Sequence, residues 1–298
     1  MKTKYMFLSF LLLAACQQME TEHSVLEENA CRPDSIWSFS IEAAKDGAQT
    51  KALDLVNEGA RLNAYWKNTE TVAMYKGGTL LGSLSVTPGA GEKPATATLS
   101  GSITAPGLAV NDALTLLFPR TTWDYTGQTG TLTGAYSIEE KYAYVTATVN
   151  VSSITGSSVT TTMATFANEE SIYRFSFLNG ASALSVKSYT ISAANGRLVQ
   201  SRTYSSGWSS AYGSVDVTPA SPTSDPLYVS LRNESTAADN YSFVITGADD
   251  KFYLASKSIP GTVLDTPGKF ISAQNISVTL QSFSPAPSGV VSSSANIF

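Results

Sequence analysis

Between residues 36 and 280, short runs rich in Val, Thr and aromatic residues alternate with turns rich in Gly and Pro, and this pattern restricts the chain to an all-β fold. Runs of this length bounded by turn residues are typical of the strands of a sandwich. The sequence contains no amphipathic pattern long enough to predict a helix. The predicted strands form a first series, 36–43, 71–75, 79–86, 95–99, 114–118, 130–136 and 142–149, and a second series, 173–178, 183–192, 198–203, 214–217, 227–231, 241–246, 251–256 and 273–280.

The two series are separated at residues 166–170, where Asn and Glu residues interrupt the strand pattern. We therefore predict two β-sandwich domains in tandem, residues 35–166 and residues 167–283. A chain of 298 residues, of which 43% are hydrophobic and 14% charged, has enough apolar side chains for two cores. Residues 284–298, rich in Pro and Ser, are predicted to be a flexible tail.

The first predicted strand, residues 36–43, has the clearest alternation in the chain. Trp37, Phe39, Ile41 and Ala43 fall on one face, and serines and a glutamate occupy positions on the other. Such a period of two predicts a strand with one buried face. The following residues 45–51 are polar and contain a glycine, so we expect an exposed loop there.

The first 16 residues have the pattern of an export signal. Two lysines precede an apolar run over residues 6–13, and Ala14-Ala15-Cys16 follows it. The run is shorter than the roughly 20 residues that span a bilayer. Because Cys follows Leu-Ala-Ala directly, the segment resembles a bacterial lipoprotein signal. Residues 1–15 are then the signal peptide, Cys16 carries acyl chains such as palmitate in the outer membrane, and residues 16–34 form an acidic tether.

Composition argues against several classes of function. The only other cysteine, Cys31, has no partner once Cys16 is acylated, so a disulfide framework is excluded. The single histidine, His23, lies in the tether, which leaves the folded part without His-dependent nucleophiles or imidazole ligands for zinc. Adjacent carboxylates such as Asp249-Asp250 and Glu139-Glu140 point apart and make poor acid–base pairs. We predict no enzyme activity, cofactor or metal, and the net charge of −5 predicts no nucleic acid partner.

Several segments together resemble the fimbrillin family, the type V pilus subunits of Bacteroidales. They are the cysteine signal, the first strand, the segment Tyr-Trp-Lys-Asn-Thr-Glu-Thr-Val-Ala-Met-Tyr at residues 65–75, Leu-Phe-Pro at 117–119 and Pro-Gly-Lys-Phe at 267–270. The family's usual residues are replaced by Asn-Thr-Glu at positions 68–70. The resemblance implies two transthyretin-like, Greek-key β-sandwiches and a role as a pilus subunit in cell adhesion.

The resemblance also implies an assembly mechanism. A trypsin-like protease cuts the chain after the first strand, the strand leaves, and a strand from another pilin subunit enters the groove by β-augmentation. The cut would release the subunit from its lipid anchor into the extracellular pilus. Lys51 lies where the family's cut falls, and Arg61 is the second candidate; a permanent first strand without processing is the alternative.

A replacement strand should come from a flexible end. In the tail, Val291, Ala295 and Ile297 share one strand face, and about 15 extended residues at ~3.3 Å each can span a sandwich groove. The alternative is a tail with no such role. Whether the subunit belongs to the stalk, tip or anchor stays open, as does its adhesion ligand, which can be a host or bacterial glycan or protein.

A second hypothesis is a surface lipoprotein that binds glycans and does not polymerise. Trp123, Tyr125, Trp208 and Tyr212 lie among small polar residues, as aromatic platforms for sugars do. In the alternative interpretation these rings pack against the edge of a sandwich. Exposure of Trp123 and Trp208 on one common surface distinguishes the two.

Overall fold

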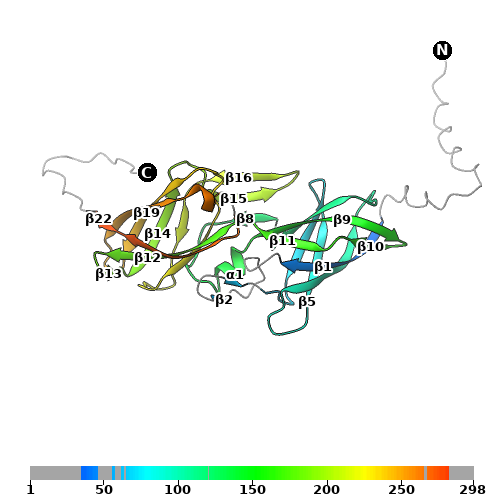
Figure 1. Cartoon of the computed structure of the whole chain (residues 1–298), viewed down its shortest axis with the longest axis horizontal. Coiled ribbons are helices and arrows are strands. Elements are labelled where there is room, and N and C mark those ends of the chain that lie inside the picture. The colour runs from blue at the N-terminus through cyan, green and yellow to red at the C-terminus, as the bar shows by residue number, and fades with distance from the viewer. Residues whose placement is uncertain are drawn as a thin grey trace, which may run out of the picture.

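The computed structural model describes residues 35–45, 56–57, 62–63, 65–119, 121–264 and 267–281. Within these ranges nearly all regular structure is strand, which confirms the all-β prediction. The two helices found there, α1 (Ile138–Lys141) and α2 (Gly261–Leu264), are single turns, and neither is long or apolar enough to cross a membrane. Figure 1 shows an elongated arrangement, with one large sheet at one end and smaller sheets at the other.

The large sheet has eight strands in the order β10-β1-β11-β9-β7-β4-β5-β6. Since β1 also pairs with β6, the paired strands form a closed ring. The strands are β1 (Ile36–Lys45), β4 (Thr71–Lys76), β5 (Thr79–Pro88), β6 (Thr96–Thr104), β7 (Ala113–Phe118), β9 (Val145–Thr155), β10 (Ser158–Thr161) and β11 (Ala164–Asn168).

The inward side chains of this ring form a first hydrophobic cluster, which includes Trp37, Leu84, Leu99 and Val149. Most of its strands are buried on one face only, as in β9, where buried and exposed positions alternate. This alternation is what the sequence pattern of an antiparallel sheet with one solvated face predicts.

Strand β4 is an exception, because Val72 to Tyr75 are buried without alternation. Val72 and Met74 belong to the first cluster, whereas Ala73 and Tyr75 point the other way into a second cluster. A continuous apolar run is typical of a strand that is covered on both faces. The side chains of the second cluster therefore cover the outer face of the large sheet at β4.

The second cluster lies mainly between two further sheets, and Phe175, Tyr189, Val229 and Phe243 are among its members. The four-stranded sheet contains β12 (Ser171–Asn179), β13 (Ser182–Ala183), β18 (Leu227–Leu231) and β21 (Phe270–Ser277). The five-stranded sheet contains β14 (Val186–Ala193), β17 (Val215–Val217), β19 (Asp239–Gly247), β20 (Phe252–Ile259) and β22 (Thr279–Leu280).

A small sheet connects the two ends of the molecule. The hairpin of β15 (Val199–Tyr204) and β16 (Trp208–Tyr212) pairs with β8 (Thr122–Asp124), which follows the large sheet's β7 in the chain. The last pair is β2 (Val56–Asn57) with β3 (Leu62–Asn63). Because Trp123, Tyr125 and Tyr144 contribute to the second cluster, apolar packing crosses the predicted boundary at residues 166–167. The division into domains at that boundary stays a prediction.

The strand predicted at residues 130–136 is wrong. The structure has turns and bends there, followed by α1. Gly130, Gly134 and Tyr136 have φ angles of 78°, 96° and 58°, which a strand does not tolerate. The alternation of residue types is therefore not sufficient to form a strand where three positions need a left-handed backbone.

Candidate functional site at the first strand

Strand β1 is paired along both edges. On one side it runs antiparallel to β6, in a register that extends from Ile36 opposite Thr104 to Ala44 opposite Thr96. On the other side it runs parallel to β10, with Phe39 opposite Val159, and to β11. The first of the described strands thus lies between two others and closes the ring, and its removal would open two edges at once.

The inward face of β1 is a continuous part of the first cluster. Trp37, Phe39, Ile41 and Ala43 are all buried, with at most 4% of any of them exposed, whereas Ile36 on the outward face is 62% exposed. This is the two-residue period of the sequence expressed as burial. The structure shows that these residues form one buried face. Excision of the strand stays a prediction.

Polar contacts anchor the N-terminal end of β1. The Trp37 indole Nε1 donates a hydrogen bond to the Ala105 carbonyl oxygen at 2.9 Å. The Ala105 N–H in turn donates to the Ser35 carbonyl oxygen at 3.2 Å, and the Ser38 N–H donates to the Ser157 carbonyl oxygen at 2.8 Å. The buried indole therefore has a partner for its N–H, which a buried donor requires.

The segment at residues 65–75 contributes a second buried tryptophan to the same core. The Trp66 ring meets Phe118 edge-on at a centroid distance of 5.7 Å and Phe166 at 5.4 Å. Edge-to-face contacts at this distance are the favoured geometry for aromatic pairs. Trp66 therefore packs in the core that β1 completes.

Several predicted site residues lie outside the described residues. These are the lipidation site Cys16, the processing candidates Lys51 and Arg61, and the proposed donor face Val291, Ala295 and Ile297. Each stays a prediction.

The aromatic residues of the glycan hypothesis do not share one exposed surface. Trp123 and Tyr125 have no exposed area. The Trp123 ring stacks on Tyr144 at 4.9 Å and contacts Trp208 at 4.1 Å, and its lack of exposed area leaves no face open to a sugar. Trp208 is half-buried and Tyr212 is exposed. For Trp123 and Tyr125 the structure corresponds to the packed alternative, because both rings are buried in the second cluster.

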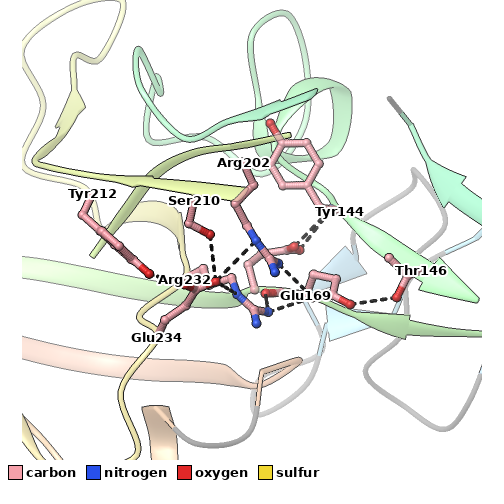
Figure 2. A network of polar contacts seen from close by, with 9 residues as sticks. Tyr144, Thr146, Glu169, Arg202, Ser210, Tyr212, Arg232 and Glu234 are labelled. Atoms are coloured by element: carbon pink, nitrogen blue, oxygen red, sulfur yellow. Dashed lines mark hydrogen bonds and ion pairs between the residues drawn. The ribbon is translucent and has the colours of Figure 1, made fainter. Parts of the chain in front are cut away.

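Next to these rings lies a network of charged groups that connects three parts of the chain (Figure 2). Arg202 of β15 is 4% exposed, and its Nη1 donates to Glu169 Oε2 at 3.1 Å. Arg232 Nη1 donates to the same oxygen at 2.8 Å, and both guanidinium Nε atoms lie 3.4 Å from Glu234 Oε1. The Arg202 guanidinium also lies over the Trp208 ring at 4.2 Å, a cation–π contact.

The network extends into the large sheet. Thr146 of β9 donates its hydroxyl to Glu169 Oε1 at 2.7 Å, and the Tyr144 N–H contacts both carboxylate oxygens of Glu170 at 3.2 Å (Figure 2). In the sequence pattern, Glu169 and Glu170 mark only an interruption between two series of strands. Arg202 in an otherwise uncharged strand is the signal that could have indicated a buried partner, because arginine is almost never buried unpaired.

In this network, burial and ion pairing shift the pKa of a charged group in opposite directions. Burial lowers the pKa of Arg202, and the nearby Arg232 charge lowers it further, while Glu169 raises it. For Glu234, burial alone would raise the pKa, but hydrogen bonds from Tyr212 and Ser210 and the charges of both arginines together lower it. The carboxylate of Glu234 is therefore stabilised in its charged form.

Within the part of the chain that the structure describes, no group of three or more His, Cys, Asp or Glu side chains could hold a metal ion.

No protein family model matches the sequence, and no curated protein matches it. Solved structures show similarity at low identity. A candidate cell adhesion protein from Bacteroides uniformis has a TM-score of 0.41 and 13% identity, over 82% of this chain and 98% of that one. A fimbrial assembly protein from Parabacteroides distasonis has a TM-score of 0.37 and 10% identity, over 84% and 100%. The C-terminally truncated tip fimbrial protein Mfa3 from Porphyromonas gingivalis has 0.34 and 9%, over 76% and 81%.

Proposed function

We propose that this protein is a structural, non-enzymatic subunit of a cell-surface adhesion pilus, and that it polymerises when β1 is exchanged for a strand of another subunit. It would reach the surface as an outer membrane lipoprotein anchored at Cys16. A trypsin-like cut, at Lys51 or else at Arg61, would separate β1 from the remainder of the chain. The observation that carries the proposal is the position of β1, which is terminal among the described strands and yet paired on both edges.

The position of β1 makes its groove specific for an extended segment. Without β1, the edge of β6 and the facing edges of β10 and β11 would present unpaired N–H and C=O groups. These groups are obligatory hydrogen-bonding partners, and a strand satisfies them better than a helix or loop can. Pockets for alternate side chains, at the places of Trp37, Phe39 and Ile41, would select the incoming sequence.

The apolar burial of β1 is large enough that the departure of β1 should be coupled to the entry of the replacement strand. Burying each of Trp37, Phe39 and Ile41 contributes roughly 1.5–3 kcal/mol, so loss of all three is comparable to the 5–15 kcal/mol that keeps a typical domain folded. A cut strand should therefore stay bound until a competing strand displaces it. Cleavage makes the subunit competent for assembly, and the incoming strand completes the step.

The experiment is limited trypsin digestion of the full-length chain in detergent, followed by N-terminal sequencing and SDS electrophoresis without boiling. We expect a fragment that begins at Ala52 and a ladder of SDS-resistant multimers. Lys51→Gln should abolish that fragment, with Arg61→Gln as the matched control for the second site.

A reversible lock on β1 tests the exchange itself. Ser40 and Ser100 are register partners on β1 and β6. Antiparallel partners have Cα atoms about 4.5–5.5 Å apart, which suits a disulfide. In a Cys31→Ser background, Ser40→Cys with Ser100→Cys should leave the cut unchanged, block the ladder when oxidised and restore it with reductant. A cut protein that never forms a ladder, or a ladder that the oxidised lock leaves intact, would overturn strand exchange.

A further inference from the structure

A cavity of about 190 Å³ lies beside the charged network, at the start of β12 and under α2. Its wall includes Glu170, Arg232, Glu234 and Thr236, and its apolar part includes Leu231 and Leu264. No residue of β1 lines it. The cavity is therefore distinct from the groove that strand exchange would use.

Arg232 and Glu234, two residues of the polar wall, each keep hydrogen-bonding capacity that the network does not use. Arg232 Nη1 donates hydrogen bonds to Glu169, and Arg232 Nε donates one to Glu234. Its Nη2 has no partner among the described residues. Glu234 Oε2 accepts a hydrogen bond from the Tyr212 hydroxyl at 2.6 Å, and no other described group donates to it. A carboxylate oxygen can accept two, so one acceptor position remains. Both side chains are held in place by their other bonds, which lowers the cost of ordering them around a ligand.

Arg232 and Glu234 are each paired with opposite charges within the protein, and the Glu170 carboxylate accepts the Tyr144 N–H. The Arg232 guanidinium faces Glu169 and Glu234, and Glu234 is also near Arg202. An added anion would meet the carboxylates, and an added cation would meet the guanidinium groups. The remaining donor and acceptor suit a neutral group that both donates and accepts, and hydroxyl groups do so.

The dimensions restrict the ligand further. Cavities for drug-sized ligands measure about 300–1,000 Å³, so this one has room for a single ring with its substituents. A sugar ring presents hydroxyls at its edge and C–H groups on its faces. The former match Arg232, Glu234 and Thr236, and the latter match Leu231 and Leu264 at the apolar part of the cavity.

We propose that this cavity binds one neutral sugar unit of a surface glycan. Arg232 Nη2 donates to a ring hydroxyl, and Glu234 Oε2 accepts from a neighbouring one. This site goes beyond polymerisation, and it is a different place from the buried ring of Trp123. It can therefore be tested on the monomer, whatever the outcome of the strand-exchange experiment.

The test is saturation-transfer difference NMR on the uncut full-length chain, in a detergent without a sugar headgroup. The probes are D-glucose, D-galactose, D-mannose, L-fucose and N-acetylglucosamine, with N-acetylneuraminic acid as the charged comparison. Thr236→Trp places an indole at the rim, where Thr236 is exposed, and leaves the charged network intact. Thr87→Trp on the exposed face of β5 is the matched control.

We expect at least one neutral sugar to bind saturably, with affinity reduced about tenfold or more by Thr236→Trp and unchanged by Thr87→Trp. Arg232→Lys, which keeps the charge and removes the second donor, should weaken the same sugar in protein that melts as a folded chain. Binding of no neutral sugar, binding of the charged sugar alone, or binding that Thr236→Trp leaves intact would overturn the proposal.

Discussion

Trp37 at the start of β1 donates its indole N–H to the carbonyl oxygen of Ala105, 68 residues later in the chain and just beyond the end of β6. This contact fixes the end of the strand that closes the large sheet. The ring itself is buried among the first cluster, so the same side chain supplies apolar burial and a satisfied polar group.

Two substitutions of Trp37 should lower the free energy of unfolding by different amounts. Trp37→Phe leaves the Ala105 carbonyl without the indole donor and should cost about 1–3 kcal/mol, whereas Trp37→Ala also leaves a cavity and should cost about 3–5 kcal/mol. Urea denaturation followed by fluorescence measures both. Ile36→Ala on the exposed face is the control and should stay within about 0.5 kcal/mol of the wild type.

The identity of the replacement strand can be examined with peptides. On cleaved protein, a peptide of residues 36–45 should bind about tenfold or more tightly than one of residues 289–298. The side chains of Val291, Ala295 and Ile297 contain fewer carbon atoms than those of Trp37, Phe39 and Ile41, and each methylene buried in the groove would contribute ~0.8 kcal/mol. Fluorescence anisotropy of labelled peptides gives both affinities, and a scrambled 36–45 peptide controls for alternation. Equal affinities would show that the protein's own tail fits the groove.

The charged network should be strongly coupled. Arg202→Met removes one of the two arginines that Glu169 and Glu234 share. It should cost about 3 kcal/mol, at the lower end of the range for broken buried pairs, because Arg232 still pairs with both carboxylates. Glu234→Gln should cost less, since Arg202 retains Glu169. In a double-mutant cycle the two changes should be non-additive. Additive costs would mean that the pair contributes no coupling.

Stability should fall in acid partly through Glu234. Its folded-state pKa lies below the ordinary value of 4.5, so the unfolded chain takes up the proton first as the pH decreases. The stabilisation is therefore complete above about pH 4.5 and is lost as the pH falls through the lower folded-state value. Thermal melting between pH 7 and 3 should decline less steeply for Glu234→Gln than for the wild type. Tyr212→Phe, which removes one hydrogen bond that lowers the pKa, should lie between them.

Two glycines in the segment 130–136 separate backbone strain from crowding. Both have positive φ, but a Cβ at Gly130 would lie 2.6 Å from Leu227 Cδ2, whereas one at Gly134 would meet nothing within 4 Å. Gly134→Ala should cost about 1 kcal/mol for the backbone alone, and Gly130→Ala should cost more because the Leu227 side chain must move. Equal melting temperatures for the two variants would contradict the close approach of Gly130 to β18.

A feature of the fold can be predicted from sequence when it depends on residues that are close together in the chain. The alternation of Trp37, Phe39, Ile41 and Ala43 predicts both a strand and its buried face, because successive side chains of any strand point to opposite sides. The segment 130–136 shows the limit of that argument, since its residue types suit a strand and its backbone does not. Trp123 and Trp208 show another limit, because an aromatic ring among small polar residues suits an exposed platform as well as a packed edge.

The all-β class and the inward face of β1 follow from residue order alone, because both rest on the two-residue period of the strand and on local turn residues. The folded chain adds the pairing of β1 with β6, β10 and β11, the contacts of Trp123 with Tyr144 and Trp208, and the ion pairs of Glu169 with Arg202 and Arg232. Each of these joins residues that are far apart in the chain, and strand pairing and ion pairing are chosen by burial and geometry in the folded molecule rather than by any local pattern.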